Sequence, residues 1–312
     1  MVRNVTGVVL AAVVALGGLA GCSEDRAETG SSAASSSTTT PAATLDCAAD
    51  LVACARESSI GDVVPDAPST ATGEPIRLGM INQENTPLGS YPELSSATRA
   101  AIEFVNTELG GVNGRPIELE VCNTEFSPEG STACAQQFVQ DGVPAVLGGI
   151  DVFGTGIDTL AENEIPYVGG IPVSAQAVEN ANSFQWSGGT WGATVAFAHH
   201  AATEVKADSV AIVYPEFGPI SDSADYGRIT LENAGVTDVV MVPYPITATD
   251  LSSPIQAANS ASPDAVIMLA ADTGCKGAFD GFATVGVEAQ VYLVGACASP
   301  KIIEEAGPDK TE

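Results

Sequence analysis

The stretch from Ile76 to Cys122 constrains the fold of this chain more than any other. It begins with a short apolar run, Ile76 to Ile81, which is typical of a buried parallel strand. After a polar break, apolar residues recur at helical spacing: Ala97, Ala101, Phe104, Val105 and Leu109. Gly110 and Gly111 favour a helix stop, and Pro116 to Val121 alternates as a second strand. Strand, helix and strand predict a right-handed βαβ unit, whose strand carboxyl ends form the edge at which open α/β sheets bind ligands.

A short motif within this unit resembles a known family. The sequence from Asn106 to Ile117, NTELGGVNGRPI, is similar to the N-x-x-GG-(I/V)-NGRP-I signature of the type I periplasmic binding proteins. The resemblance is specifically to the leucine/isoleucine/valine-binding family that supplies ABC transporters with branched-chain amino acids. It implies an α/β fold of two lobes, each a doubly wound parallel sheet.

The first 22 residues indicate a lipoprotein signal peptide. Arg3 supplies the positive charge at the start, and Val8 to Leu19 form the apolar core. The sequence Leu-Ala-Gly-Cys, which ends at Cys22, is a lipobox. The apolar core is shorter than the roughly 20 residues that a membrane-spanning helix needs, so cleavage is expected. We therefore expect Cys22 to be a lipid anchor and the protein to lie at the extracytoplasmic face of the cell membrane.

Residues 23–73 predict a tether, because a segment rich in Ser, Thr, Ala and Pro cannot bury enough apolar surface to order itself. A short possible helix inside it carries Cys47 and Cys54. In a straight helix their Cα atoms would lie about 10 Å apart, beyond the ~7 Å limit of a disulfide. A bridge between them requires the helix to break.

Six cysteines remain when Cys22 is set aside, and an even number in an exported chain predicts disulfides. Their connectivity is open. Pairing between neighbours is the simplest arrangement, and it joins Cys122 to Cys134 and Cys275 to Cys297. A metal site is disfavoured because close Cys-x-x-Cys spacing is absent and the chain has two histidines.

The remaining sequence alternates between predicted strands and helices. We assign residues 74–190 to the first lobe and residues 191–312 to the second, with Phe184 to Gly192 as the crossing between them. In the first lobe we predict later helices at residues 128–140 and 155–162, and later strands at residues 144–149 and 166–169. In the second they are a helix at 193–205 and strands at 209–214, 236–242, 265–270 and 290–294.

The resemblance covers about 230 residues, from Glu74 to Gly307. In the family the chain then returns to the first lobe over roughly another hundred residues. We therefore expect a second lobe without its return segment, either because the chain is truncated at the carboxyl end or because the second lobe closes in a shorter way.

Topology and the resemblance together predict the residues that contact a ligand. Two lobes of parallel sheet would hold it between their strand carboxyl ends, where amides and helix N-termini favour a carboxylate. On the first lobe we expect Asp151, Thr155 and Ser174. On the second lobe we expect Phe217, where relatives carry an aromatic residue, and Asp272.

Each of these residues has an alternative role. Thr155 binds a ligand carboxylate or caps its helix, and Ser174 binds the ligand or makes a turn. Phe217 covers the ligand or packs in the core. Because Cys297 stands near the position of the family's ammonium-binding glutamate, we expect Asp151 or Asp272 to supply that carboxylate.

Composition and motifs narrow the function. Thirty-nine acidic and eleven basic residues give a net charge of −28, which disfavours nucleic acid and anionic lipid as partners. No phosphate-binding loop, nucleophile elbow or His-Glu-x-x-His motif occurs, so we expect neither an enzyme nor a cofactor. The favoured hypothesis is a monomeric, lipid-anchored solute-binding protein that delivers a small amino-acid-like or amide solute to an ABC transporter permease. A ligand sensor of the same fold, and an anchored enzyme, are the alternatives.

Overall fold

A computed structural model describes residues 47–86 and 88–310 of the chain, with the backbone alone at residues 272, 273 and 308. The predicted signal peptide, its Cys22 and residues 23–46 of the tether lie outside the described residues. The rest of the tether contains helix α1 (Leu51–Arg56) and a 3-10 turn at Gly61–Val63. None of the helices in this described part has the length and apolarity that a membrane crossing needs.

Helix α1 begins late enough for Cys47, which precedes it, to pair with Cys54, which lies within it. It begins at Leu51, where the Asp50 side chain accepts a hydrogen bond of 2.8 Å from the Ala53 amide. Cys47 therefore lies before the helix, and its Cα is 5.5 Å from that of Cys54, to which it is disulfide-bonded. The two cysteines are therefore not joined by a continuous helix, which is the condition that the sequence sets for this bridge.

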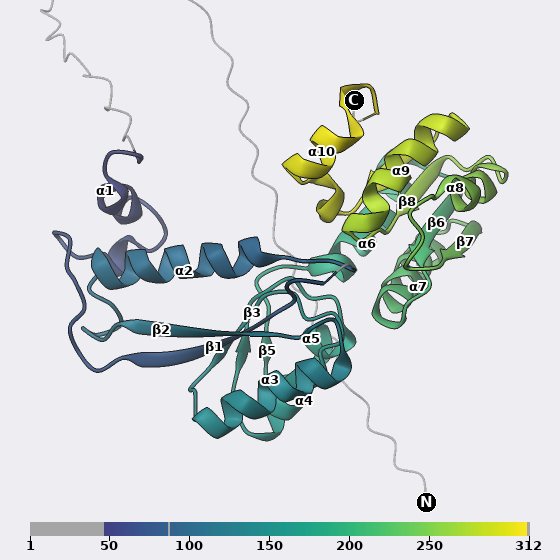
Figure 1. Ribbon diagram of the computed structural model, residues 1–312. Coiled ribbons are helices and arrows are strands. Elements are labelled where there is room, and N and C mark those ends of the chain that lie inside the picture. Colours follow the sequence, from purple (N-terminus) through teal and green to yellow (C-terminus); the bar gives the residue numbers. More distant parts are fainter. Residues whose placement is uncertain (1–46, 87, 311–312) are drawn as a thin grey trace, which may run out of the picture. The chain divides into compact units, whose positions relative to one another are not determined.

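The first sheet is parallel throughout and has the strand order β2-β1-β3-β4-β5. Its strands are β1 (Ile76–Asn82), β2 (Ile117–Asn123), β3 (Val146–Gly148), β4 (Tyr167–Val168) and β5 (Ser183–Phe184). Helix α2 (Pro92–Thr107) covers one face, and α3 (Pro128–Asp141) and α4 (Thr155–Glu162) cover the other (Figure 1). We call this sheet, its helices and the short α5 (Ala175–Glu179) the first lobe.

The core of the first lobe lies between the sheet and α3 and α4. Ile81, Val146 and Tyr167 pack there against Phe138 and Leu160, all of them buried. Gly79 on β1 permits this packing, because a Cβ at that position would come within 2.7 Å of the Phe138 ring. Ser127 caps the start of α3 by accepting a hydrogen bond from the Gly130 amide, and Gly142 ends it at φ 64°.

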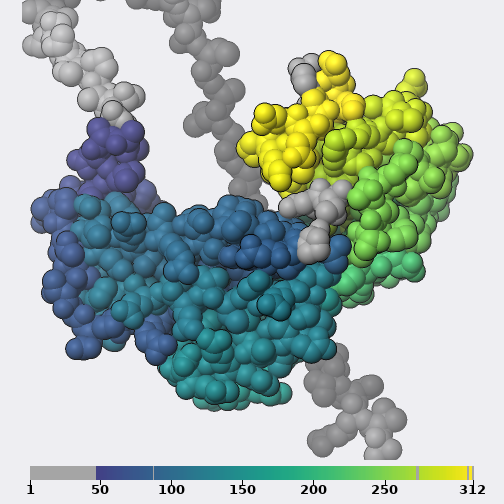
Figure 2. All heavy atoms as spheres, in the orientation of Figure 1, coloured from purple at the N-terminus to yellow at the C-terminus, as the bar shows by residue number. Residues whose placement is uncertain are grey.

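Helix α2 differs from its prediction in both its end and its buried face. It ends at Thr107, before Gly110 and Gly111, which follow in left-handed conformations. Ala97 and Ala101 are exposed, and α2 forms part of the surface in Figure 2. The predicted Phe104 and Val105 are half-buried, and the rest of the buried face consists of Leu94, Ser95, Thr98 and Ile102. Hydroxyl groups can occupy this face because Ser95 donates to Glu84 Oε1 and Thr98 to the Leu94 carbonyl.

The second sheet is also parallel and has the strand order β7-β6-β8-β9. Its strands are β6 (Ser209–Pro215), β7 (Asp238–Tyr244), β8 (Ala265–Met268) and β9 (Gln290–Leu293). Its helices are α6 (Gly189–His200, continued by a π turn at Ala201–Val205), α7 (Gly218–Asn233), α8 (Ser252–Asn259), α9 (Asp272–Val285) and α10 (Pro300–Ala306). Short 3-10 turns at Gly295–Ala298 and Pro308–Lys310 complete this second lobe.

Alternate residues of the second sheet enter two cores, as the period of a strand dictates. Val210 and Ile212 of β6 pack with Leu231 and Ala198 on the side of α6 and α7. Ala211 and Val213 pack on the other side, where α8 contributes Ile255. Both faces of the sheet are covered, as expected for parallel strands with continuous apolar runs.

The first lobe contains one strand that the sequence did not predict. Ser183–Phe184 pairs with β4 as the edge strand β5, whereas we assigned Phe184 to the crossing between lobes. The pairing is only two residues long, and Phe184 is exposed, so neither length nor apolar burial marks it in the sequence.

Candidate functional site

A cavity of about 1030 Å³ lies at the carboxyl ends of both sheets. The two sheets belong to one compact unit, residues 46–312. In each sheet the lining includes residues at the point where the strand order reverses. Gln83 and Ile150 follow β1 and β3, while Phe217 and Leu269 follow β6 and β8. Open α/β sheets bind their ligands at such switch points.

The wall of this cavity is mainly apolar. A volume of this size is at the upper end of the roughly 300–1,000 Å³ usual for small-molecule sites, which are apolar with a few placed polar groups. Its apolar side chains include Leu94, Phe126, Ile150, Val152, Val173, Phe217, Ile220, Ile246 and Leu269. The cavity can therefore accept a solute with a substantial apolar body.

Three phenylalanines form a cluster at the cavity. Phe217 of the second lobe stacks on Phe126 with ring centroids 5.4 Å apart, and it meets Phe153 edge-on at the same distance. Phe126 and Phe153 also contact each other edge-on. Phe126 and the preceding Glu125 have φ values of 54° and 53°, a left-handed conformation that side chains rarely adopt. This strained turn after β2 places the Phe126 ring in the cavity wall.

Asn82 ties together the loops that follow β1 and β3. Its side chain is fully buried, and its Nδ2 donates to the carbonyl of Tyr91 over 2.8 Å and to Glu84 Oε1 over 3.0 Å. Its Oδ1 accepts a hydrogen bond of 3.0 Å from the Ile150 amide. Both loops contribute to the lining, so this one residue fixes two parts of the cavity wall.

The polar part of the lining is small. Glu93 at the start of α2 and Lys301 on α10 bring one negative and one positive charge, and both residues are exposed. Gln83, in contrast, is buried, with 1% of its surface exposed. Within the described residues, no group of three or more His, Cys, Asp or Glu side chains is placed to hold a metal ion.

Asp151 and Thr155 are not part of this lining. Asp151 is buried, and its carboxylate accepts hydrogen bonds from Ser131 Oγ (2.6 Å) and the Gly154 amide (3.1 Å). Burial raises the pKa of the Asp151 carboxyl above its ordinary value of 3.8, against the opposing effect of these hydrogen bonds. Thr155 donates to the Pro128 carbonyl over 2.7 Å and so joins α4 to the start of α3.

The other three predicted contacts lie in different environments. Ser174 is fully buried and caps α5 by accepting a hydrogen bond of 3.2 Å from the Ala177 amide. Phe217 lines the cavity. Asp272 is the first residue of α9, next to the lining residue Ala271, and its side chain lies outside the described part of the structure.

Several lining residues were not selected from the sequence. Gln83 follows the carboxyl end of the first predicted strand, but its residue type does not distinguish it from the neighbouring Asn82 and Glu84. Phe126 follows a strand end, where a phenylalanine in a chain with few aromatic residues was the available signal. Lys301 lies on a helix beyond the last predicted strand.

Two disulfides lie close to strand ends. Cys122 is joined to Cys134, with Cα atoms 5.6 Å apart, and this bridge ties β2 to α3. Cys275 is joined to Cys297, with Cα atoms 5.1 Å apart, and both sulfurs belong to buried residues. The second bridge ties the start of α9 to the turn after β9. Lining residues Ala271 and Ala296 lie within four residues of its cysteines.

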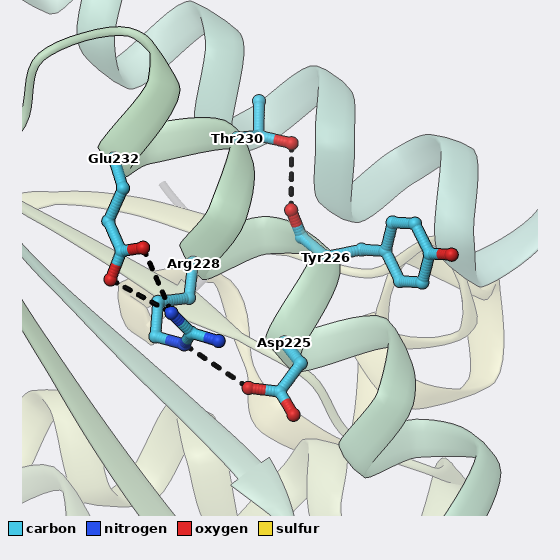
Figure 3. A network of polar contacts seen from close by, with 5 residues as sticks. All are labelled: Asp225, Tyr226, Arg228, Thr230 and Glu232. Carbon is cyan, nitrogen blue, oxygen red and sulfur yellow. Dashed lines mark hydrogen bonds and ion pairs between the residues drawn. The ribbon is translucent and has the colours of Figure 1, made fainter.

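A second polar cluster, on α7, is a surface feature. Arg228 pairs with both oxygens of Glu232 at 2.9 Å and with Asp225 at 3.2 Å, while Thr230 donates to the Tyr226 carbonyl (Figure 3). These partners are three or four residues apart on one helix, and the two carboxylates are exposed. Such pairs stabilise a helix surface weakly and leave no unpaired charge for a ligand.

A smaller hollow of about 340 Å³ lies on the first lobe, away from the strand carboxyl ends. Residues of α2, among them Ile102 and Asn106, form one side of it, and Ile117 and Leu119 of β2 form the other. Asn106 is already engaged there, since it donates to the Ile117 carbonyl and accepts from the Ile117 amide.

Comparisons with known proteins agree on one fold. The sequence profile of a family described as periplasmic binding protein matches residues 75–312. The Leu/Ile/Val-binding protein homolog 3 of Brucella melitensis biotype 1 is 24% identical over 174 residues. That match covers 53% of this chain and 46% of the relative, so the chain spans about half the length of that curated protein.

Solved structures extend the comparison. A leucine-binding protein from Thermotoga maritima has a TM-score of 0.61 at 16% identity, over 75% of this chain and 67% of its own. A solute-binding protein of an ABC transporter from R. palustris, in complex with 4-hydroxybenzoate, has a TM-score of 0.61 at 20% identity, over 76% and 66%. At these identities the likeness shows a shared fold of two parallel-sheet lobes.

Proposed function

The chain belongs to the periplasmic binding protein family, and on this basis we propose that it is the lipid-anchored, extracytoplasmic solute-binding component of an ABC importer. One observation carries the proposal. The large cavity is lined from the switch points of both sheets, which is where this kind of fold captures a small molecule. The arrangement is suited to binding a solute and handing it to a permease.

The lining favours a particular kind of solute within the proposed amino-acid-like or amide class. Aromatic and aliphatic side chains dominate it, so the body of the solute is apolar. Lys301 is the one cation among the lining residues that the structure describes, and its exposed ammonium is available to a carboxylate. The leucine and 4-hydroxybenzoate named for the two structural neighbours each combine a carboxylate with an apolar body, which is consistent with this choice.

The predicted site residues enter the proposal in two roles. Phe217 contacts the solute directly, together with Phe126. Asp151, Thr155 and Ser174 hold the loops behind the lining, because their polar atoms are hydrogen-bonded within the first lobe. Asp272 remains a proposed contact, at the start of α9 beside the lining.

The experiment that tests the proposal is calorimetric titration of the chain with amino acids, their amides and small aromatic carboxylates. A solute in the cavity should lose affinity roughly tenfold or more in Phe217→Ala, since aromatic contacts contribute about 0.5–1.5 kcal/mol each beyond their burial. Phe184→Ala is the matched control, because Phe184 is exposed on β5 and outside the lining. Binding that is equally strong in both variants would place the solute elsewhere.

A further inference from the structure

Gln83 is a buried polar residue in the wall of the cavity. It directly follows β1, lines the cavity and is 1% exposed. Its Nε2 donates a hydrogen bond of 2.9 Å to the Gly89 carbonyl. A carbonyl oxygen can only accept, so the orientation of the Gln83 amide is determined: the nitrogen faces Gly89 and Oε1 faces away from it.

The Oε1 atom of Gln83 has no partner. It is buried and accepts no hydrogen bond from any described residue. The preceding Asn82 makes the contrast clear, because its Nδ2 and Oδ1 are both hydrogen-bonded. Buried acceptors are nearly always paired, so this one calls for a donor that the described residues do not supply.

The loop that follows Gln83 is built to hold this amide. The Tyr91 amide donates to the Gln83 carbonyl over 3.0 Å, and Thr86 Oγ1 donates to the same Gly89 carbonyl that the Gln83 amide uses. Gly89 has φ 135°, and a Cβ there would lie 3.0 Å from Gln83 Nε2. A glycine is required for the loop to close this tightly on the side chain.

We propose that Gln83 Oε1 accepts a hydrogen bond from a neutral donor of the solute, a hydroxyl or an amide N–H, and so selects the solute. The inference rests on the proposed function of the cavity. A neutral donor is favoured over an ammonium, because a buried ammonium needs a carboxylate partner, whereas the amide oxygen is neutral and Glu93 is exposed. Gln83 thereby provides the acceptor that the sequence assigned to Asp151 or Asp272, but for an uncharged group.

The test uses pairs of probes that have nearly the same shape and differ in one donor. The pairs are benzamide and acetophenone, isobutyramide and 3-methyl-2-butanone, and 4-hydroxyphenylacetate and phenylacetate. Leucine and 4-methylpentanoate form a fourth pair, which differs in an ammonium. Calorimetry on the wild-type chain needs no variant. At least one amide or hydroxyl probe should bind about tenfold more tightly than its partner, and the ammonium should give no such gain.

Two variants then identify the residue responsible. Gln83→Met keeps the length of the side chain but removes the acceptor. In this variant the ratio of the two affinities within a pair should fall to about one. Thr86→Val is the matched control: it removes another hydrogen bond to the Gly89 carbonyl and leaves Oε1 in place, so the preference should persist. Equal loss of preference in both variants would mean that the loop, not the acceptor, matters, and would overturn the inference.

The remaining outcomes separate this inference from the proposed function. If the wild-type chain binds its tightest solute without a hydroxyl or amide N–H, or if Gln83→Met keeps the preference, the inference is wrong and the solute-binding function stands. If neither these probes nor any amino acid, amide or carboxylate of the wider panel binds, both the proposed function and the inference about Gln83 fail.

Discussion

Replacing Asn82 with alanine should destabilise the first lobe strongly. The change removes the hydrogen bonds from Asn82 to the Tyr91 carbonyl and from the Ile150 amide to Asn82, at 2.8 and 3.0 Å. The Tyr91 carbonyl keeps a hydrogen bond of 3.2 Å from the Leu94 amide, but the Ile150 amide, on a buried residue, loses its acceptor. The unsatisfied Ile150 amide costs about 1–3 kcal/mol and the lost hydrogen bond to the Tyr91 carbonyl about 0.5–1.5 kcal/mol, which predicts a total loss of about 1.5–4.5 kcal/mol.

Urea unfolding followed by far-ultraviolet circular dichroism measures this loss as a change in the free energy of unfolding. Asn163→Ala is the matched control, because Asn163 is exposed and its side chain donates only to the Thr159 carbonyl of its own helix. The control should change stability by less than about 0.5 kcal/mol. The solute affinity of Asn82→Ala should fall as well, since the loops after β1 and β3 are no longer joined.

A loss of less than about 1 kcal/mol in Asn82→Ala, with an unchanged urea dependence, would refute this reasoning. It would mean that the Ile150 amide finds another acceptor, and that the Asn82 side chain does not fix the two loops at the cavity.

Three further predictions concern the anchor, a buried acid and a disulfide. Cys22→Ala should release the protein from membranes, and finding an unmodified Cys22 by mass spectrometry of membrane-extracted protein would contradict the anchor. The raised pKa of Asp151 means that its contribution to stability is greatest below about pH 3.8 and is lost as pH rises through the folded-state pKa. Asp151→Asn should therefore gain stability relative to wild type as pH increases, in urea titrations from pH 4 to 8. Replacing Cys275 and Cys297 by serine should cost roughly 3 kcal/mol for a loop of 22 residues, and an unchanged urea midpoint would exclude a stabilising bridge.

The parallel sheets could be predicted because their signals are local. Apolar runs bounded by helix caps and glycines fix most strands and helices, and α4 has the predicted bounds of Thr155–Glu162. The buried face of α2 could not be predicted in the same way. Alanines such as Ala97 and Ala101 bury little area, so their position is decided by how Ser95 and Thr98 satisfy their hydroxyls.

The site was predictable at the level of strand ends but not of individual atoms. Phe217 follows β6 and lines the cavity, as its position in the sequence predicts. Ser174 also follows a strand, yet its hydroxyl caps α5. Sequence cannot distinguish a hydroxyl that caps its own helix from one that is free for a ligand. Whether Gln83 Oε1 has a partner depends on how the loop to Tyr91 folds back on the side chain. No local sequence pattern predicts that conformation.

Hydrogen exchange with and without a solute found by titration tests the central claim most directly, namely that the solute lies where the strand ends of both sheets meet. The account predicts slower exchange of amides at residues 83–91, 124–126 and 150–152 in the first lobe, and at 216–217, 269–271 and 294–296 in the second. Protection confined to one lobe, or centred on residues 99–107 and 117–119 around the smaller hollow between α2 and β2, would contradict it.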